Sequence, residues 1–132
     1  MPKHALRVLL AEDNAVNQQL TQHLLHHLGY HVDIVADGQE VLSALACQSY
    51  DVVLMDVQMP TLDGLETTRR IRVRMPQQKQ PMVVALTASS RQSDREACFR
   101  AGMDLYMEKP LEVDTLREIM QMCAYESRIH HS

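Results

Sequence analysis

The sequence predicts a single α/β domain in which a five-stranded parallel sheet is wrapped on both faces by five helices. Short apolar runs alternate with segments of helical spacing five times, and repeated strand-helix units are typical of parallel sheets. The chain has 132 residues, 45% of them hydrophobic, which is enough to bury one core. We therefore expect one domain over 1–132, with a core at about 6–123 and a C-terminal tail at 124–132.

Each predicted element has its own signal. The apolar runs that read as strands cover 6–11, 31–36, 51–56, 82–87 and 104–107. The segments with helical spacing lie near 14–28, 38–47, 63–75, 89–101 and 112–123. The first helical segment is marked by Leu20, Leu24 and Leu28, and both Gly29 and Gly102 are suited to follow a helix end.

The composition of the strands predicts their order in the sheet. The first, third and fourth runs are almost continuously apolar, as expected for central strands covered on both faces. The second run alternates polar and apolar residues and the fifth is short and mixed, so both are expected at the edges. The order 2-1-3-4-5 satisfies these conditions and reverses the chain between strands 1 and 3. Ligands bind beyond the carboxyl ends of the strands at such a reversal.

Charge and composition exclude several classes of protein. The net charge of -4 gives no broad attraction to nucleic acid or to an anionic membrane. We find neither a run long enough to span a bilayer nor a start typical of a signal peptide, so a cytoplasmic location is expected. Cys47, Cys98 and Cys123 are odd in number and widely spaced, which predicts small buried hydrophobes rather than disulfide or metal partners.

Three carboxylates are expected to meet at the predicted chain reversal. Glu12 and Asp13 follow the first strand, and Asp56 ends the apolar third strand, VVLMD. Like charges so close repel, so either their pKa values rise or a cation joins them, and a hard ion such as Mg²⁺ suits this oxygen ligand set. The alternative is that Asp13 and Asp56 are turn or N-cap residues. That alternative fits either aspartate alone better than it fits the three carboxylates together.

A hydroxyl and an ammonium are expected at the same edge of the sheet. Thr87 ends the fourth strand, and Lys109 and Pro110 follow the fifth. Facing a metal-bound carboxylate, these groups suit a transferred phosphoryl group, whose reaction depends on positioning and on neutralisation of its oxygens. Alternatively, Thr87 or Ser89 caps the next helix and Lys109 is a solvated charge. A cis bond before Pro110 could fix the direction of Lys109.

These residues together resemble the receiver domain of two-component phosphorelay signalling, over roughly residues 6–123. The family pattern is an acidic pair, an acceptor aspartate, a Thr or Ser and a Lys-Pro pair after successive strands. All of them are present, as Glu12, Asp13, Asp56, Thr87, Lys109 and Pro110. The stretches AEDNAVNQ, MDVQMPTLDGLE and AGMDLYMEKP are most similar to receivers of hybrid sensor histidine kinases. The resemblance implies the flavodoxin-like form of the doubly wound fold.

The resemblance also implies a cofactor and a reaction. Asp13, Asp56 and the backbone carbonyl of Gln58 would bind Mg²⁺ or Mn²⁺, with Glu12 acting through water. Asp56 would accept a phosphoryl group from a phosphohistidine of a histidine kinase or a histidine phosphotransfer domain, and water would later hydrolyse the product. The domain would thus catalyse its own phosphorylation and dephosphorylation, whether it stands alone or is a fragment of a hybrid kinase.

The same resemblance implies how the phosphoryl group would be held and sensed. Lys109 would pair with it, and Thr87 and the backbone N–H of Ala88 would donate hydrogen bonds to it. Tyr106, the switch aromatic, would enter the space that Thr87 vacates, which would change the face formed by 89–101, 104–107 and 112–123. That face could also form a homodimer. No contact with nucleic acid or membrane is expected from this domain, which would lie in the cytoplasm, attached to a membrane sensor kinase if it is excised from one.

Two other functions remain open on the sequence. A haloacid-dehalogenase-like phosphatase also forms an aspartyl phosphate, but it needs a second aspartate two residues on, where Gln58 stands. An interaction module of the same fold would leave the acidic site unphosphorylated.

Three further sets of residues are interpreted as structural. The histidines are predicted to lie on a solvated helix face, as are the arginines; the methionines are predicted to fill the core, and any that is exposed would indicate a partner surface. The sets are His23, His26, His27 and His31; Arg69, Arg70, Arg72 and Arg74; and Met103, Met107, Met120 and Met122.

Overall fold

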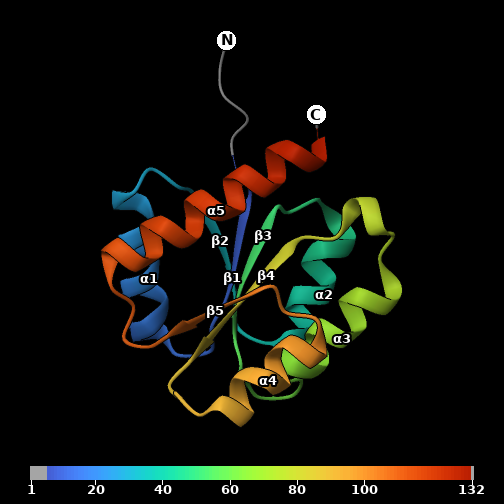
Figure 1. The fold of residues 1–132 in the computed structure, drawn as a ribbon, viewed down its shortest axis with the longest axis horizontal. Coiled ribbons are helices and arrows are strands. Elements are labelled where there is room, and N and C mark those ends of the chain that lie inside the picture. The colour runs from blue at the N-terminus through green and yellow to red at the C-terminus, as the bar shows by residue number, and fades with distance from the viewer. Residues whose placement is uncertain (1–5, 132) are drawn as a thin grey trace.

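The computed structural model describes residues 6–131 and shows a central sheet with helices on both faces (Figure 1). The strands are β1 Val8–Ala11, β2 Val32–Val35, β3 Val52–Asp56, β4 Met82–Thr87 and β5 Leu105–Glu108. All four neighbouring pairs are parallel, in the order β2-β1-β3-β4-β5. The predicted fold class and strand order are therefore confirmed.

The central strands are the ones that the sequence marked as continuously apolar. Every residue of β1 and β3 is buried, whereas the edge strands β2 and β5 are largely half-buried. The predicted strand ends differ from those observed by at most two residues, and β4 matches at both ends. For example, β1 begins at Val8, where it pairs with Val52 of β3, rather than at Leu6.

Five α-helices connect and follow the strands, and their starts have a local cause. They are α1 Ala15–His27, α2 Gly38–Cys47, α3 Gly64–Arg74, α4 Gln92–Ala101 and α5 Val113–His131, with a 3-10 turn, η1, at Gln77–Lys79. Asn14, Asp37 and Asp63 are the N-caps of α1, α2 and α3, and each side chain accepts a backbone N–H three residues later. Gly102 ends α4 at φ 109°, a left-handed conformation that favours glycine.

The last helix is longer than the sequence predicted. A helix near 112–123 followed by a tail at 124–132 was expected, but α5 continues to His131. Residues 124–131 contain neither glycine nor proline, so nothing in the sequence ends the helix after Cys123. Ser132, the end of the predicted tail, lies outside the described residues, as do residues 1–5. No helix in the described part of the chain is both long and apolar enough to cross a membrane.

Two hydrophobic clusters cover the two faces of the sheet. Leu9 of β1 belongs to the cluster beneath α2, α3 and α4, which includes Val41 and Ile71. The next residue of β1, Leu10, belongs to the cluster beneath α1 and α5, with Leu25 among its members. This alternation follows from the two-residue period of a strand. Because helices cover both faces, the carboxyl ends of the strands are left accessible.

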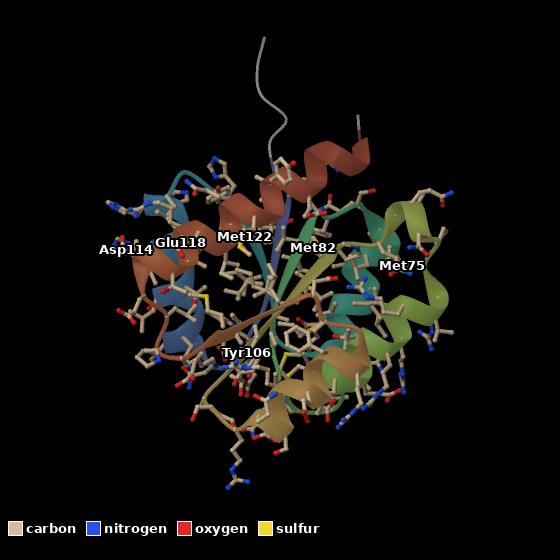
Figure 2. The ribbon with its side chains drawn as sticks, viewed as in Figure 1. Met75, Met82, Tyr106, Asp114, Glu118 and Met122 are labelled. Carbon is tan, nitrogen blue, oxygen red and sulfur yellow. The ribbon has the colours of Figure 1, made fainter. Side chains whose placement is uncertain are left out.

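The structural interpretations of single residue types are confirmed in part. Cys98 and Cys123 are buried, but Cys47 is exposed, which corrects the prediction that all three cysteines are buried: it is the last residue of α2 and lies off the buried stripe of that helix. All four histidines are exposed. The methionines around β5 and α5 are buried except Met122 on α5 (Figure 2), which is exposed. Its exposed fraction is 46%.

The prediction of a solvated arginine face on α3 was wrong for Arg72. This side chain is half-buried and crosses to the start of β5, where its guanidinium contacts Asp104 at 2.7 Å and the Gly102 carbonyl at 2.9 Å. Arg72 lies on the side of α3 that faces α4 and the loop before β5. Its guanidinium therefore donates to these acceptors instead of to water. Arg69 and Arg74 are exposed, as expected.

Candidate functional site

A cleft of about 690 Å³ lies beyond the carboxyl ends of the central strands. It is lined by residues that follow β1, β3, β4 and β5, because parallel strands place these ends at one edge of the sheet. Seven residues predicted for the site line this cleft: Glu12, Asp13, Asp56, Gln58, Thr87, Ala88 and Lys109. Tyr106 and Pro110, also predicted, are not among its lining residues.

The three carboxylates meet as expected. One oxygen each from Glu12, Asp13 and Asp56 lies within 4.8 Å of the others. Glu12 and Asp56 are 2% and 6% exposed, whereas Asp13 is exposed. Carboxylates this close favour a bound cation, and an all-oxygen donor set with an accessible position suits Mg²⁺. The site therefore fits a divalent ion.

The alternative that the two aspartates only cap helices or form turns is not supported. The N-cap of α1 is Asn14, not Asp13. Asp56 ends β3, and its Oδ1 does accept the backbone N–H of Gln58 at 3.0 Å, which closes the turn. Its Oδ2 atom, however, faces the ammonium of Lys109, so Asp56 has a second contact that a turn residue does not need.

Lys109 lies inside the cleft rather than in solvent. Its Nζ atom donates to Asp56 Oδ2 and to Glu12 Oε1, both at 3.0 Å. Burial alone lowers the pKa of Lys109, but the hydrogen bonds and charges of Glu12 and Asp56 outweigh it, so the pKa is raised above its ordinary value. Lys109 is thus a cation at neutral pH, and it lies beside the Asp56 carboxylate, as the sequence analysis expected. The Lys109–Pro110 peptide bond is cis.

Thr87 and the residues that follow it also line the cleft. Thr87 is the last residue of β4, and its Oγ1 atom accepts the backbone N–H of Ser89 at 3.1 Å. The alternative role for Thr87 or Ser89, as a side-chain cap of α4, is wrong, because Arg91 holds the N-cap position and makes no side-chain cap bond. Ala88 follows Thr87 and also lines the cleft.

Tyr106 reaches the cleft indirectly. It lies on β5, half-buried (Figure 2), and its hydroxyl donates to the backbone carbonyl of Ser89. Ser89 therefore contacts both Thr87 and Tyr106, a connection that sequence reasoning missed because a serine in a loop carries no distinctive signal. Arg95 of α4, whose guanidinium carbon lies 4.6 Å from the centre of the Tyr106 ring, was missed for the same reason.

The arrangement can bind a cation and an anion next to each other. The carboxylates provide the cation site, and an ammonium and a hydroxyl stand at its border. A phosphoryl group carries negative oxygens that a metal ion and an ammonium can neutralise together. Phosphoryl transfer is the chemistry for which this combination of groups is suited.

The comparison with known families decides the identity of the domain. The family model that describes the response regulator receiver domain matches residues 8–121. The chain belongs to this family. Its function is that of a phospho-accepting receiver domain in two-component phosphorelay signalling.

Individual relatives agree with the family. The receiver domain is 35% identical over 127 residues to hybrid signal transduction histidine kinase K of Dictyostelium discoideum, covering 92% of this chain and 10% of that protein. The chain thus spans about a tenth of the length of this relative. The receiver domain of sensor histidine kinase PA1611 from Pseudomonas aeruginosa is 41% identical with a TM-score of 0.82, covering 91% of this chain and 98% of that one. Its structure has a magnesium ion coordinated in the active site cleft.

A third relative was solved together with a partner. This chain is also similar to a co-crystal structure of the histidine phosphotransfer protein Ypd1 and the receiver domain of Ssk1 from Saccharomyces cerevisiae. The TM-score is 0.84 and the sequence identity 26%, and the match covers 93% of this chain and 91% of that chain. The receiver domain of Ssk1 thus has a histidine phosphotransfer protein as its partner in that structure.

Proposed function

We propose that Asp56 of this receiver domain is the phospho-acceptor, that the donor is a phosphohistidine of a histidine kinase or a phosphotransfer domain, and that the reaction requires a divalent cation. The distance of 3.0 Å between Lys109 Nζ and Asp56 Oδ2 is the observation that carries this proposal. It leaves an ammonium where the oxygens of a phosphoryl group on Asp56 would need a counter-charge.

The reaction that we propose is a nucleophilic displacement at phosphorus. A carboxylate oxygen of Asp56 forms a bond to phosphorus while the bond from phosphorus to the histidine nitrogen breaks, and the imidazole leaves with that electron pair. Lys109 pairs with the transferred oxygens, and Thr87 and the backbone N–H of Ala88 donate hydrogen bonds to them. Water later attacks the same phosphorus, the bond from phosphorus to the Asp56 oxygen breaks, and inorganic phosphate leaves, which restores the carboxylate. The domain thus catalyses both its phosphorylation and its dephosphorylation.

The cation is assigned to the carboxylates on the basis of their donor chemistry. Asp13, Asp56 and the backbone carbonyl of Gln58 would hold Mg²⁺ or Mn²⁺, with Glu12 acting through water. When bound, the ion supplies positive charge next to the phosphoryl oxygens. The proximity of the three carboxylate oxygens, within 4.8 Å, supports this assignment.

An exposed apolar pair on α1 supports a docking place for the phosphodonor. Val16 and Leu20, 65% and 59% exposed, are four residues apart and so share one face of the helix. Asn17, between them in sequence, lines the cleft. A partner that covers this pair would hold its phosphohistidine close to Asp56.

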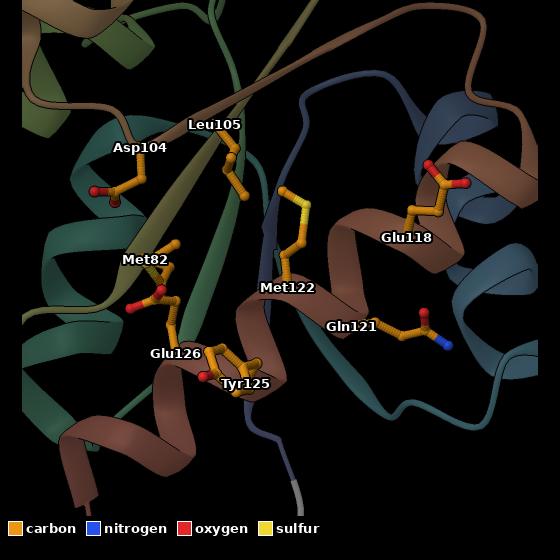
Figure 3. Close-up of a pocket in the computed structure, with 8 residues that line it drawn as sticks. All are labelled: Met82, Asp104, Leu105, Glu118, Gln121, Met122, Tyr125 and Glu126. Atoms are coloured by element: carbon orange, nitrogen blue, oxygen red, sulfur yellow. The ribbon is translucent and has the colours of Figure 1, made fainter.

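The face formed by α4, β5 and α5 is our candidate for the output surface. A groove of about 820 Å³ lies between α5 and the starts of β4 and β5 (Figure 3), and Met122 and Tyr125 are exposed at its side. Exposed Arg100 on α4 and exposed Asp114 and Glu118 on α5 offer opposite charges for a two-fold homodimer. The proposal assigns no nucleic-acid or membrane contact to this domain and places it in the cytoplasm, attached to a membrane sensor kinase if it is part of one.

The test is incubation with Mg²⁺ and a small acyl phosphate, followed by measurement of the intact mass. We expect one added phosphoryl mass on the wild type, none on Asp56→Asn, and none on the wild type when a chelator replaces Mg²⁺. Asp114→Asn, which removes an exposed acid on α5, should behave as the wild type. An adduct that persists on Asp56→Asn would move the nucleophile elsewhere, and turnover of a small phosphate ester by the wild type would favour a haloacid-dehalogenase-like phosphatase.

A further inference from the structure

Ser89 connects the phosphoryl-binding wall of the cleft to the switch tyrosine. Its backbone N–H donates to Thr87 Oγ1 at 3.1 Å, and its backbone carbonyl accepts the hydroxyl of Tyr106. Its own hydroxyl donates to the Asp94 carboxylate on α4 at 2.5 Å. One loop residue thus joins β4, β5 and α4, and a shift of this loop must move at least one of these bonds.

Arg95 holds the other side of the tyrosine. Its guanidinium carbon lies 4.6 Å from the centre of the Tyr106 ring, within the range of a cation–π contact. Arg95 follows Asp94 directly in α4, so the helix that anchors Ser89 also presents the cation to the ring. Tyr106 is therefore held at two points, its hydroxyl by Ser89 and its ring by Arg95.

We propose that Arg95 is a positioning residue, which acts through Tyr106 to hold the β4–α4 loop and Thr87 in the arrangement that binds the phosphoryl group. The inference rests on the proposed function, because it assigns to Thr87 a role toward a phosphoryl group on Asp56. It goes beyond that function by naming a cation outside the cleft that controls the switch.

The expected effect of Arg95 on phosphorylation follows from the linkage between the position of the Tyr106 ring and the position of Thr87. In this structure the hydroxyl of Tyr106 is bonded to the Ser89 carbonyl, and the backbone N–H of the same residue is bonded to Thr87 Oγ1. A contact that stabilises Tyr106 in this position therefore also stabilises the β4–α4 loop in the arrangement proposed to bind the phosphoryl group. Loss of the cation weakens a partly exposed cation–π contact, which changes such an equilibrium by about two- to five-fold.

The electrostatic surroundings of the ring agree with this contact. Burial raises the pKa of the Tyr106 phenol, and the charge of Arg95 opposes that rise. Glu108 on β5 and the Cys98 thiol on α4 raise the pKa further, so Arg95 is the cation that acts against them. Removal of its charge should raise the phenol pKa, whereas a lysine in its place should retain part of the effect.

The experiment compares Arg95→Met, which keeps length but loses charge, with Arg95→Lys, which keeps charge. Phosphorylation of Asp56 by a small acyl phosphate and Mg²⁺ is followed over time by intact mass. We expect Arg95→Met to slow it about two- to five-fold, and Arg95→Lys to recover most of the rate. In a Tyr106→Leu background the methionine substitution should have no further effect, because the cation then has no ring to act on.

Fluorine NMR on protein labelled with 3-fluorotyrosine provides a readout that general destabilisation does not produce. The Tyr106 signal, assigned as the one that Tyr106→Phe removes, should titrate at higher pH in Arg95→Met. Arg74→Met, which removes an exposed cation on α3, should leave both the rate and this titration unchanged.

Three outcomes would overturn the inference: an unchanged or faster rate in Arg95→Met, an equal slowing with and without Tyr106, or an unmoved titration. Absence of any adduct on the wild type would instead contradict the proposed function. In that case the fluorine titration still tests the contact between Arg95 and Tyr106.

Discussion

The two ends of the sheet use charge in different ways. At the carboxyl ends, Glu12, Asp13 and Asp56 lie close together, and the ammonium of Lys109 pairs with Glu12 and Asp56. At the amino ends of β4 and β5, the N–H groups of the Arg72 guanidinium donate to four acceptors of the chain. These are the Asp104 carboxylate at 2.7 Å, the side-chain oxygen of Gln80 at 2.9 Å, and the backbone carbonyls of Gly102 at 2.9 Å and Pro81 at 3.0 Å.

The difference separates a site that binds from a site that stabilises. Charges and hydrogen bonds around Arg72 are matched within the chain, so a ligand there would have little to neutralise. The carboxyl-end cluster keeps an excess of negative charge, which costs stability until a cation joins it. Unbalanced charge in a buried setting is thus the feature that distinguishes the functional end of this sheet.

The largest effect that this comparison predicts is on Lys109→Met. Without its ammonium, the buried carboxylates of Glu12 and Asp56 have no cationic partner in the described chain, so the free energy of unfolding should fall by about 3 kcal/mol in the absence of divalent ions. Mg²⁺ binds only the folded cluster and so raises the free energy of unfolding. This increase should be larger for Lys109→Met than for the wild type. Urea denaturation with and without Mg²⁺ measures both quantities.

Lys79→Met is the matched control, because Lys79 is exposed in the 3-10 turn η1 at the other end of the sheet. It should change neither the stability nor the response to Mg²⁺. If Lys109→Met were as stable as the wild type without divalent ions, the carboxylates would not repel one another enough to matter, and the contrast between the two ends would fail.

A smaller effect is expected at the balanced end, for Arg72→Met. The variant loses the hydrogen bonds of the guanidinium and leaves Asp104 without its ion pair, which should lower the free energy of unfolding by about 2 kcal/mol. Phosphorylation of Asp56 by a small acyl phosphate should not change, because the cleft lies at the other end of the sheet. Arg74→Met, on an exposed position of the same helix, should cost little; a slowed phosphorylation in Arg72→Met would show that the two ends are not independent.

The same contrast explains what the sequence could and could not predict. The residues of the cleft follow the ends of apolar strands, so the strand order alone brings Glu12, Asp56 and Lys109 together. Arg72, by contrast, lies within an arginine-rich helix, and its partner Asp104 is 32 residues away. No local pattern marks such a pair, because it depends on how α3 packs against the loop before β5.

The contacts that connect α4 to β5 could not be predicted from the sequence either. Ser89 and Arg95 matter through the position of α4 relative to β5, which periodicity does not specify. The end of α5 was missed for a different reason. The apolar spacing fades after Cys123, but helix propensity and the lack of a terminating residue carry the helix on to His131.

The smallest effect concerns Cys123, whose thiol is buried near the amino ends of the strands. Burial, followed by the charges of Asp104 and Glu126, raises its pKa from 9.0 to about 12. Above pH 9.0 the unfolded chain loses this proton while the folded chain keeps it, so the unfolded state binds fewer protons and stability falls as pH rises toward 12. At pH 10 this contribution is about 1.4 kcal/mol.

Cys123→Ala removes this titration but leaves the alkaline loss that comes from other groups. Creating a small cavity should destabilise the variant by an amount that does not depend on pH. The difference in unfolding free energy between wild type and variant should therefore shrink by about 1.4 kcal/mol from pH 7 to pH 10, as measured by urea denaturation. Cys47→Ala, at an exposed thiol, should show a constant difference. A difference that stays constant for Cys123→Ala as well would mean that burial and the nearby acids do not hold the proton on this thiol in the folded state.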